Sequence, residues 1–359
     1  MNYHKIISGE QQTIGAAIAR AGLTVLEALY FPAITIRNLW YDVVPGAVHS
    51  VDVPVISIGN VTMGGTGKTP LTAAVVKYIL NRAGRPAVIS RGYKAKPGEL
   101  NDEGKELQTR NPDGIYVQNP NRVLAAKTLC SQDESSRPRA IILDDGFQHR
   151  RLSRNLDVVL IDALNPFGYD RICPRGTLRE SLRSLRRADC VIITHADCVS
   201  EQRLQDIEQR VLAYNPGITV SRACHRPGAL RLITGETVAL ESINGKRVLA
   251  FCGLGNPEAF RQTVNSLGCV CEQFNVYPDH YQYTNTDQND IISLARESKV
   301  DAIVCTMKDY VKLSDAMTRS PVPVYGVEID MEFLTGEKEF WALIDNVLSP
   351  DDGYCPPKK

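Results

Sequence analysis

Residues 53–69 read VPVISIGNVTMGGTGKT, an apolar and β-branched run followed by three closely spaced glycines, Lys68 and Thr69. The stretch 69–84 that follows has a helical pattern. A glycine-rich turn between a strand and a helix lets backbone N–H groups surround phosphate oxygens, and the helix N-terminus adds a partial positive charge. We therefore predict a phosphate-binding loop in which Lys68 reaches the outer phosphates and the Thr69 hydroxyl reaches a magnesium ion.

The loop departs from the strict G-x-x-x-x-G-K-[ST] pattern, because Thr62 stands where the first glycine belongs. GGTGKT is similar to the deviant loops of a related branch of NTPases, although Met63 occupies the place of their signature lysine. The residues that we expect to contact a nucleotide are Thr62, Met63, Gly64, Gly65, Thr66, Gly67, Lys68 and Thr69.

Short apolar runs alternate with helical patterns along the first 200 residues. The strand-like runs are 53–59, 86–93, 140–146, 157–163 and 189–197, and 122–130 has a helical pattern. Buried strands separated by helical segments indicate a mostly parallel sheet with crossover helices, and such sheets bind ligands at the carboxyl ends of their strands. We therefore predict a P-loop NTPase-like α/β domain with a mostly parallel sheet flanked by helices.

The same pattern restarts after about residue 220, with strand-like runs at 246–257, 269–281, 301–309 and 323–329 and a helix from Asp287. This predicts a second, smaller α/β domain. The expected organisation is a P-loop domain at 1–225, which includes an N-terminal helix near 14–44, a β-rich linker at 226–245, and the smaller domain at 246–359.

Asp144 and Asp145 directly follow the strand-like run IIL at 141–143. An acidic pair at the end of a buried strand beside a phosphate-binding loop can hold magnesium or its water ligands, although it can also serve only as a helix cap. Because the glycine-rich loop is present, we expect the pair to be part of a magnesium site.

Composition excludes one broad class of function. Lysine plus arginine is 41 and aspartate plus glutamate is 41, so the 359-residue chain has no basic excess with which to coat nucleic acid. The ten cysteines are scattered, with no CxxC pair and no secretory leader at the start, which indicates a reducing, cytoplasmic compartment.

The most apolar long stretch is 14–44, in which Ile14, Ile18, Val25 and Leu29 fall at helical spacing. Charged residues and Pro32 interrupt it, so it contains no run of 18 uncharged apolar residues that would span a bilayer. Two alternatives stay open at this point: a core helix packed on the first domain, or a helix that lies in a membrane surface.

Several motifs occur in one order along the chain, and together they resemble the tetraacyldisaccharide 4'-kinase family of Gram-negative bacteria over roughly residues 15–345. The motifs are GNVTMGGTGKTP (59–70), SRGY (90–93), Asp102-Glu103, DDGFQHRRL (144–152), PRGTLRES (174–181), FCGLGNPEAF (251–260), YPDHYQY (277–283) and TMKDYVKL (306–313). The resemblance implies ATP-dependent phosphorylation of the 4'-hydroxyl of a lipid-linked glucosamine disaccharide 1-phosphate, at the cytoplasmic face of the inner membrane.

The resemblance also implies roles for individual residues. Gly64–Thr69 match the family's ATP loop, with Lys68 acting on the phosphates. Asp144, Asp145 and Glu180 match acids of the magnesium site, to which we add Thr69 and Glu103. Asp102 matches the proposed catalytic base and His280 the histidine that orients this base from the second domain. If the dyad is formed across the two domains, we expect domain closure around ATP to assemble it.

An anionic disaccharide phosphate needs hydrogen-bond donors, and arginine suits phosphate well. The expected substrate contacts are Arg91, Tyr93, Arg122, Gln148, His149 and Arg179, which could instead be surface ion pairs or core polar groups. The cluster Arg183, Arg186 and Arg187 indicates a solvated helix face or, alternatively, a patch for lipid headgroups.

The sequence differs from the family's usual pattern at Asn101, Gly104, Tyr169 and Met307. Two other functions stay open: a nucleotide-driven switch that controls a partner, and a membrane-surface scaffold with a decayed site. Intact acids and Lys68 speak against decay. We expect a monomer whose cofactors are ATP and Mg²⁺ and whose partners are the lipid substrate and the inner-membrane surface.

Overall fold

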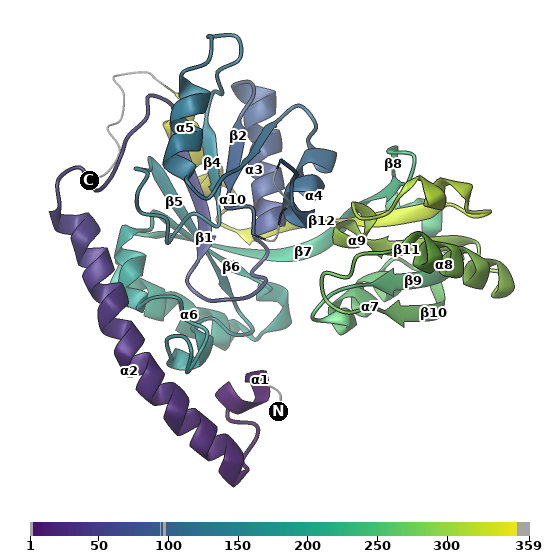
Figure 1. The fold of residues 1–359 in the computed structure, drawn as a ribbon, viewed down its shortest axis with the longest axis horizontal. Coiled ribbons are helices and arrows are strands. Elements are labelled where there is room, and N and C mark those ends of the chain that lie inside the picture. The colour runs from purple at the N-terminus through teal and green to yellow at the C-terminus, as the bar shows by residue number, and fades with distance from the viewer. Residues whose placement is uncertain (1–2, 94, 96–97, 350–359) are drawn as a thin grey trace. The chain divides into compact units, whose positions relative to one another are not determined.

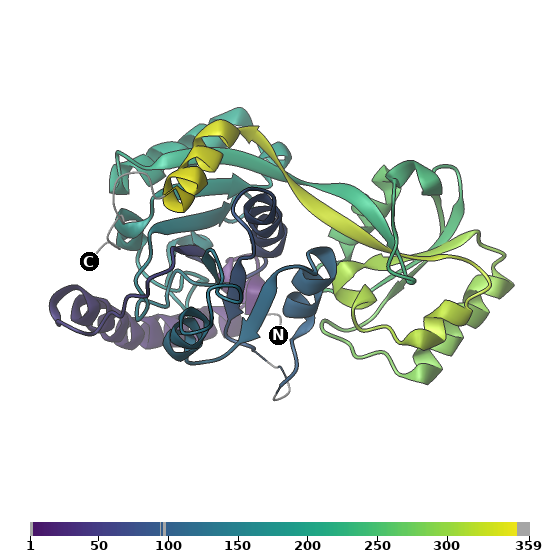
Figure 2. The same ribbon diagram turned by 90° about the horizontal axis from the view of Figure 1, so that it is seen from above.

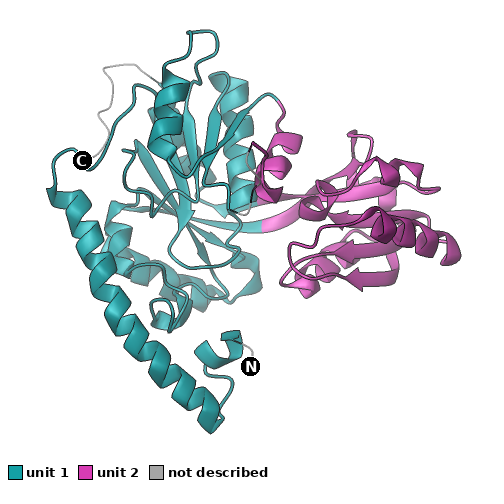
Figure 3. Cartoon of the chain, viewed as in Figure 1, with its two compact units in different colours: residues 1–93, 113–224, 332–359 teal, residues 94–112, 225–331 magenta. Residues whose placement is uncertain are grey.

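The computed structural model describes residues 3–93, 95 and 98–349, in which helices alternate with strands (Figures 1 and 2). These residues form two compact units (Figure 3). Unit 1 comprises 1–93, 113–224 and 332–359, and unit 2 comprises 94–112 and 225–331. The predicted α/β fold class is confirmed.

Unit 1 is built on strands in the order β7-β6-β5-β1-β4-β2-β3, in which every neighbouring pair is parallel. The strands are apolar and β-branched and are mostly buried on both faces, as in other parallel sheets. Its elements are α1 (Tyr3–Ile7), α2 (Ile14–Val43), β1 (Val55–Asn60), α3 (Lys68–Arg82), β2 (Ala87–Ser90), β3 (Ile115–Gln118), α5 (Arg122–Cys130), β4 (Ile141–Asp144), β5 (Leu156–Asp162), β6 (Cys190–Thr194), α6 (Glu201–Tyr214) and α10 (Glu337–Leu348).

Unit 2 contains a smaller part of the sheet, with strands in the order β10-β9-β11-β12-β7. Strand β8 pairs with β7 in the antiparallel direction. Strands β7 (Thr219–Leu232) and β12 (Val324–Thr335) each pass from one unit into the other. The remaining elements are α4 (Asp102–Arg110), β8 (Thr237–Val238), β9 (Arg247–Cys252), α7 (Pro257–Ser266), β10 (Val270–Val276), α8 (Asn285–Glu297), β11 (Ala302–Thr306) and α9 (Met307–Tyr310).

The boundaries of the two units differ from those of the expected domains. The segment 226–245 and the segment after residue 331 are both assigned differently. The expected linker, 226–245, belongs to unit 2, where β8 pairs with the second half of β7. The C-terminal helix α10 belongs to unit 1, because Trp341 stacks on Tyr78 of α3 with ring centroids 4.2 Å apart. The Tyr78 hydroxyl also donates to Asp345.

Helix α4 lies between β2 and β3 in sequence but belongs to unit 2. Its last residue, Arg110, donates to the Ile329 carbonyl at 2.8 Å, pairs with Asp330, and lies 3.7 Å from Glu328. Because this guanidinium is only 8% exposed and has three anionic or carbonyl partners on β12, it fixes α4 to unit 2.

Helix α2 is the longest helix and extends along the outside of unit 1 (Figure 1). Only Ala16 and Ile34 of its 30 residues are buried, so the core-helix alternative is wrong. By length and composition alone it could cross a membrane, and 6% of its most apolar 18-residue window is buried. Polar contacts hold it to unit 1: the Glu27 carboxylate accepts from the Ile172 amide at 2.7 Å.

The packing of α4 generates a prediction about stability. Glu106 of α4 is 6% exposed, and burial raises its pKa to about 7 despite the nearby Lys308 and Arg110. The folded protein therefore keeps the Glu106 carboxyl protonated up to a higher pH than the unfolded chain does. The contribution of Glu106 to the free energy of unfolding falls as pH rises from about 4.5 to 7. Glu106→Gln removes this penalty and should stabilise the protein at pH 8 by up to roughly 3 kcal/mol, with a much smaller gain at pH 5.

Urea unfolding at the two pH values measures this difference, with the exposed Glu297→Gln of the same unit as the control. Equal effects of Glu106→Gln at pH 5 and pH 8 would contradict the prediction.

Candidate functional site

The glycine-rich loop connects β1 to α3 in unit 1. Gly64 has φ 125° and Gly67 has φ 81°, which are left-handed conformations that favour glycine, and Gly67 is the N-cap of α3. Lys68 and Thr69 then form the first turn of the helix, whose unpaired N–H groups and dipole favour an anion. The sequence pattern therefore produces the strand, loop and helix that it predicts.

Backbone contacts brace the loop from the 177–179 segment. The Met63 amide donates to the Thr177 carbonyl at 2.7 Å, and the Arg179 amide donates to the Val61 carbonyl at 2.8 Å. On another side, the Thr194 hydroxyl at the end of β6 donates to the Thr66 carbonyl at 3.1 Å. The loop is thus supported by two segments that are distant in sequence.

The acidic pair lies at the same edge of the sheet as the loop. Asp144 ends β4 in register with Ile58 of β1, and its side chain is largely buried. Asp145 has φ 49°, lies 3.6 Å from the Lys68 ammonium, and accepts two bonds from Arg179 at 2.8 and 2.9 Å. Burial opposes ionisation of Asp145, but Lys68 and Arg179 together hold its pKa below the ordinary value of aspartate.

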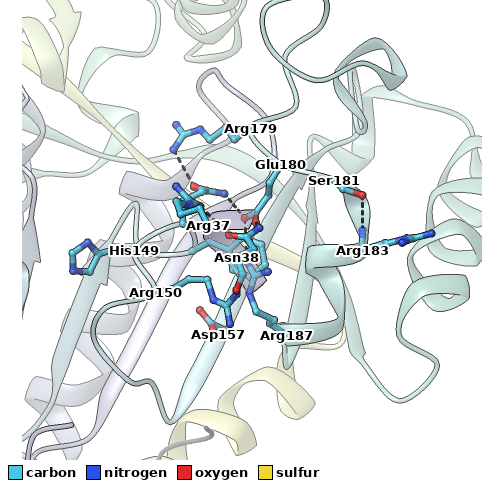
Figure 4. Close-up of polar contacts among 12 residues, drawn as sticks. Arg37, Asn38, His149, Arg150, Asp157, Arg179, Glu180, Ser181, Arg183 and Arg187 are labelled. Carbon is cyan, nitrogen blue, oxygen red and sulfur yellow. Dashed lines mark hydrogen bonds and ion pairs between the residues drawn. The ribbon is translucent and has the colours of Figure 1, made fainter. Parts of the chain in front are cut away.

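Glu180 is fully buried and holds a polar cluster together (Figure 4). Its carboxylate accepts from Asn38 of α2 at 2.9 Å, from Gln148 at 3.1 Å, and from Arg187 at 3.0 and 3.1 Å. The Arg187 guanidinium also lies over the Phe147 ring. Arg187 is therefore an ion-pair partner of Glu180. Neither alternative expected for its cluster, a solvated helix face or a patch for lipid headgroups, applies to this residue.

The five predicted metal ligands are not assembled into one group. Among residues 3–93, 95 and 98–349, no three His, Cys, Asp or Glu side chains are arranged to hold a metal ion. Glu180 is engaged as described above, and Glu103 lies in unit 2, 3.7 Å from the Lys308 ammonium. The other three predicted ligands, Thr69, Asp144 and Asp145, lie at the loop end of unit 1.

The predicted substrate residues divide into two groups. Arg122 donates to the Asp145 carbonyl at 3.0 Å, Gln148 donates to the Asn60 carbonyl at 2.9 Å, and Arg179 binds Asp145. These three side chains support the loop and the acidic pair. Arg91 and Tyr93 follow β2 and are exposed.

His149 is a further predicted substrate residue, and it differs from the three that support the loop. Burial and nearby arginines lower its pKa to about 4, so the imidazole is neutral at physiological pH. Its Nε2 atom is buried and has no hydrogen-bond partner among the residues that the structure describes. A buried polar atom in this position costs free energy unless a ligand or water completes it.

Unit 2 contains the predicted dyad. The Asp102 side chain, at the first turn of α4, accepts from His280 Nδ1 through its Oδ2 atom at 3.3 Å. Asp102 is 17% exposed and His280 is 44% exposed, with φ 60°. Because both residues belong to unit 2, the expectation that domain closure assembles the dyad is wrong.

The departures from the family pattern have local physical roles. The Asn101 side chain caps α4 by accepting from the Gly104 amide at 3.0 Å. Met307 is 3% exposed within the core of unit 2, so an acid is replaced there by a packed apolar side chain. Tyr169 has φ 62°, and its amide donates to Asn165.

Sequence reasoning missed several residues of these clusters. The sequence pattern indicates only a strand at Thr194, although a polar residue at the carboxyl end of a strand is a signal for a ligand site. Asn38 is 142 positions from its partner Glu180, and nothing local in the sequence connects the two. Asp309 and Lys312 lie in the motif TMKDYVKL (306–313), whose letters alone do not indicate that both side chains are buried and that Lys312 lies beside Asp102.

The chain is similar to known proteins over most of its length. A family model described as Tetraacyldisaccharide-1-P 4'-kinase matches residues 19–349. The Tetraacyldisaccharide 4'-kinase of Halothermothrix orenii (strain H 168) is 36% identical over 321 residues, covering 81% of this chain and 82% of the relative. That of Anaeromyxobacter sp. (strain K) is 35% identical over 357 residues, covering 93% and 92%.

Among solved structures, LpxK from Aquifex aeolicus in complex with ATP has a TM-score of 0.70 and 26% identity, covering 92% of this chain and 100% of that chain. The family match extends over most of the chain and includes both the loop and the dyad. The chain is therefore an enzyme, and the alternatives of a nucleotide-driven switch and of a scaffold with a decayed site are set aside. The chain belongs to the tetraacyldisaccharide-1-P 4'-kinase family, the phosphotransferases that phosphorylate the 4'-position of the lipid A precursor.

Proposed function

We propose that this chain performs the 4'-kinase reaction with ATP as the donor, a nucleotide site in unit 1, and Asp102 of unit 2 as the general base. The observation that carries the proposal is the Asp102–His280 contact at 3.3 Å. A nucleotide-driven switch needs only the loop and the acidic pair, whereas transfer to a sugar hydroxyl also uses a group that accepts the hydroxyl proton.

ATP binding is supported by the loop and by the similar crystal structure of LpxK from Aquifex aeolicus, which is a complex with ATP. The left-handed glycines, the N-terminus of α3 and Lys68 together present N–H groups and a positive charge to the triphosphate. Asp145 holds the Lys68 ammonium at 3.6 Å and so keeps it beside the loop. Lys68 is therefore the residue that we expect to contact the transferred phosphoryl group.

Magnesium fits the donor set of unit 1. The Thr69 hydroxyl and the Asp144 carboxylate are oxygen ligands of the kind that Mg²⁺ takes, and these two side chains would hold the ion. When bound, the ion would neutralise charge on the phosphates. Because Asp145 is bound by Lys68 and Arg179, we assign it the role of orienting these cations rather than a direct metal bond.

The proton transfer follows from the dyad. As the 4'-oxygen bonds to the γ-phosphorus, the bond from that phosphorus to the β,γ-bridging oxygen breaks, and ADP leaves with the electron pair. The hydroxyl proton passes to the Asp102 carboxylate. His280 Nδ1–H donates to Oδ2 of the ionised carboxylate and fixes its orientation.

The acceptor and its location are finer parts of the proposal. The exposed Arg91 and the buried Nε2 atom of His149 are predicted substrate contacts that could meet the acceptor, and Tyr93 is a further exposed predicted contact. The apolar side chains of α2 support binding at the inner-membrane surface, where the lipid-linked acceptor is found. Ile18, Leu29 and Ile36 are 68, 70 and 67% exposed.

Two variants test the division of roles between the units. Asp102→Ala should lower turnover at least ~10²-fold and leave ATP affinity nearly unchanged, because it removes the base and not the loop. Lys68→Ala should impair ATP binding or transfer. Steady-state kinetics with the disaccharide 1-phosphate acceptor and direct ATP titration separate the two effects. Full turnover by Asp102→Ala would overturn the base assignment.

The membrane proposal has its own test. Replacing Ile18, Leu29 and Ile36 together with glutamate should reduce binding to phosphatidylethanolamine–phosphatidylglycerol vesicles at least ~10-fold, because three apolar contacts are lost and three anionic charges are added. Co-sedimentation measures the bound fraction. The matched control places glutamate at the exposed residues Gln202, Gln205 and Gln209 of α6, which changes net charge equally. Equal loss in both variants would show that charge alone governs binding.

A further inference from the structure

A buried lysine lies beside the proposed base. The Lys312 side chain is 3% exposed, and its ammonium is 3.8 Å from Oδ2 of Asp102. The same ammonium is 3.1 Å from Oδ1 of Asp309 and lies over the Tyr283 ring at 5.6 Å. A buried ammonium needs compensating charge and hydrogen bonds, and Lys312 has a carboxylate on each of two sides.

Asp309 is the fixed partner of this pair of carboxylates. Its side chain is fully buried, and its Oδ2 atom accepts from the Gly253 amide at 3.0 Å and from the Thr306 hydroxyl at 2.7 Å. Its Oδ1 atom accepts from the Tyr283 hydroxyl at 3.0 Å as well as from Lys312. Four donors from different segments hold the carboxylate in one orientation, so Asp309 in turn fixes the ammonium.

Tyr283 contributes to this rigidity. Burial and the adjacent Asp309 carboxylate raise the pKa of Tyr283 far above its usual range, so its hydroxyl stays protonated and donates. The carboxylate of Asp309 therefore has four donors, whereas the Asp102 side chain is 17% exposed and has a hydrogen bond to His280 and an ion pair with Lys312. Lys312 thus lies between the buried carboxylate of Asp309 and the partly exposed carboxylate of Asp102.

We infer that Lys312 is a positioning residue for the base: held by Asp309, its ammonium fixes Oδ2 of Asp102 jointly with His280 and leaves Oδ1 to take the acceptor proton. Both contacts are made to Oδ2, which sets the rotation of the carboxylate. When Asp102 gains the proton, the ammonium keeps Asp309 as its counter-ion and stays in place. This inference rests on the proposed function of Asp102.

The test is a double-mutant cycle in the full-length chain. Lys312→Met keeps the unbranched stem of the side chain without its charged end, and we expect kcat to fall about 10- to 100-fold while KM for ATP changes less than about twofold. In the Asp102→Ala background the same substitution should lower kcat by less than about twofold, because the residue acts through that base. The exposed Lys299→Met of unit 2 is the control.

The outcomes are distinct. If Asp102→Ala loses turnover and Lys312→Met does not, the inference fails and the base assignment stands. If Asp102→Ala keeps turnover, the proposed function fails. An equal loss from Lys312→Met with and without Asp102 marks a structural role and overturns the inference.

A second variant covers failure of Lys312→Met to fold, which thermal unfolding would reveal. Lys312→Arg keeps the charge beside Asp309 and displaces it relative to Asp102. It should lower kcat at least about fivefold in the wild type and have little effect in Asp102→Ala. An equal loss in both backgrounds contradicts the inference in the same way.

Discussion

The contact of Arg110 with β12 decides where the proposed base lies. The helix that carries Asp102 comes between two strands of unit 1 in sequence, yet the buried guanidinium holds it to Glu328, Ile329 and Asp330 of unit 2. Glu328 is itself bound by Arg231, so the anchoring carboxylates are part of a network. The base and the histidine that orients it consequently belong to one compact unit, while the phosphate-binding loop belongs to the other. Nucleotide binding and base geometry can therefore be altered independently.

Buried polar contacts support the loop in unit 1 in addition to its own glycines. Glu180 connects α2, Gln148 and Arg187, and Gln148 in turn donates to the backbone at the end of β1. Removing one partner of such a buried charge leaves the other uncompensated, which destabilises a protein more than the pair itself stabilises it. Glu180 thus connects α2 to the loop through Asn38 and Gln148, and the metal role that the family resemblance implies stays a prediction.

Local patterns predicted the elements whose signal lies within a few residues. The β-branched runs of β1, β4, β5 and β6, and the helix 122–130, follow directly from burial and periodicity. Helix α4 was not predicted, because its polar composition hides the cap that Asn101 provides. The placement of α4 and α10 depends on Arg110 and on the Tyr78–Trp341 stack, which are contacts between distant segments. The Asp102–His280 pair was expected only from the family resemblance, and its position within one unit required the structure.

The central claim is that the chain transfers the γ-phosphoryl group of ATP to one hydroxyl of a lipid-linked disaccharide. The most direct measurement incubates the purified full-length protein with ATP, Mg²⁺ and a lipid A disaccharide 1-phosphate in mixed micelles, and locates the new phosphate by phosphorus NMR. The account predicts a single new phosphomonoester at the 4'-hydroxyl and an equal amount of ADP. Folded protein that releases ADP without forming this product, or that forms none at all, would contradict it.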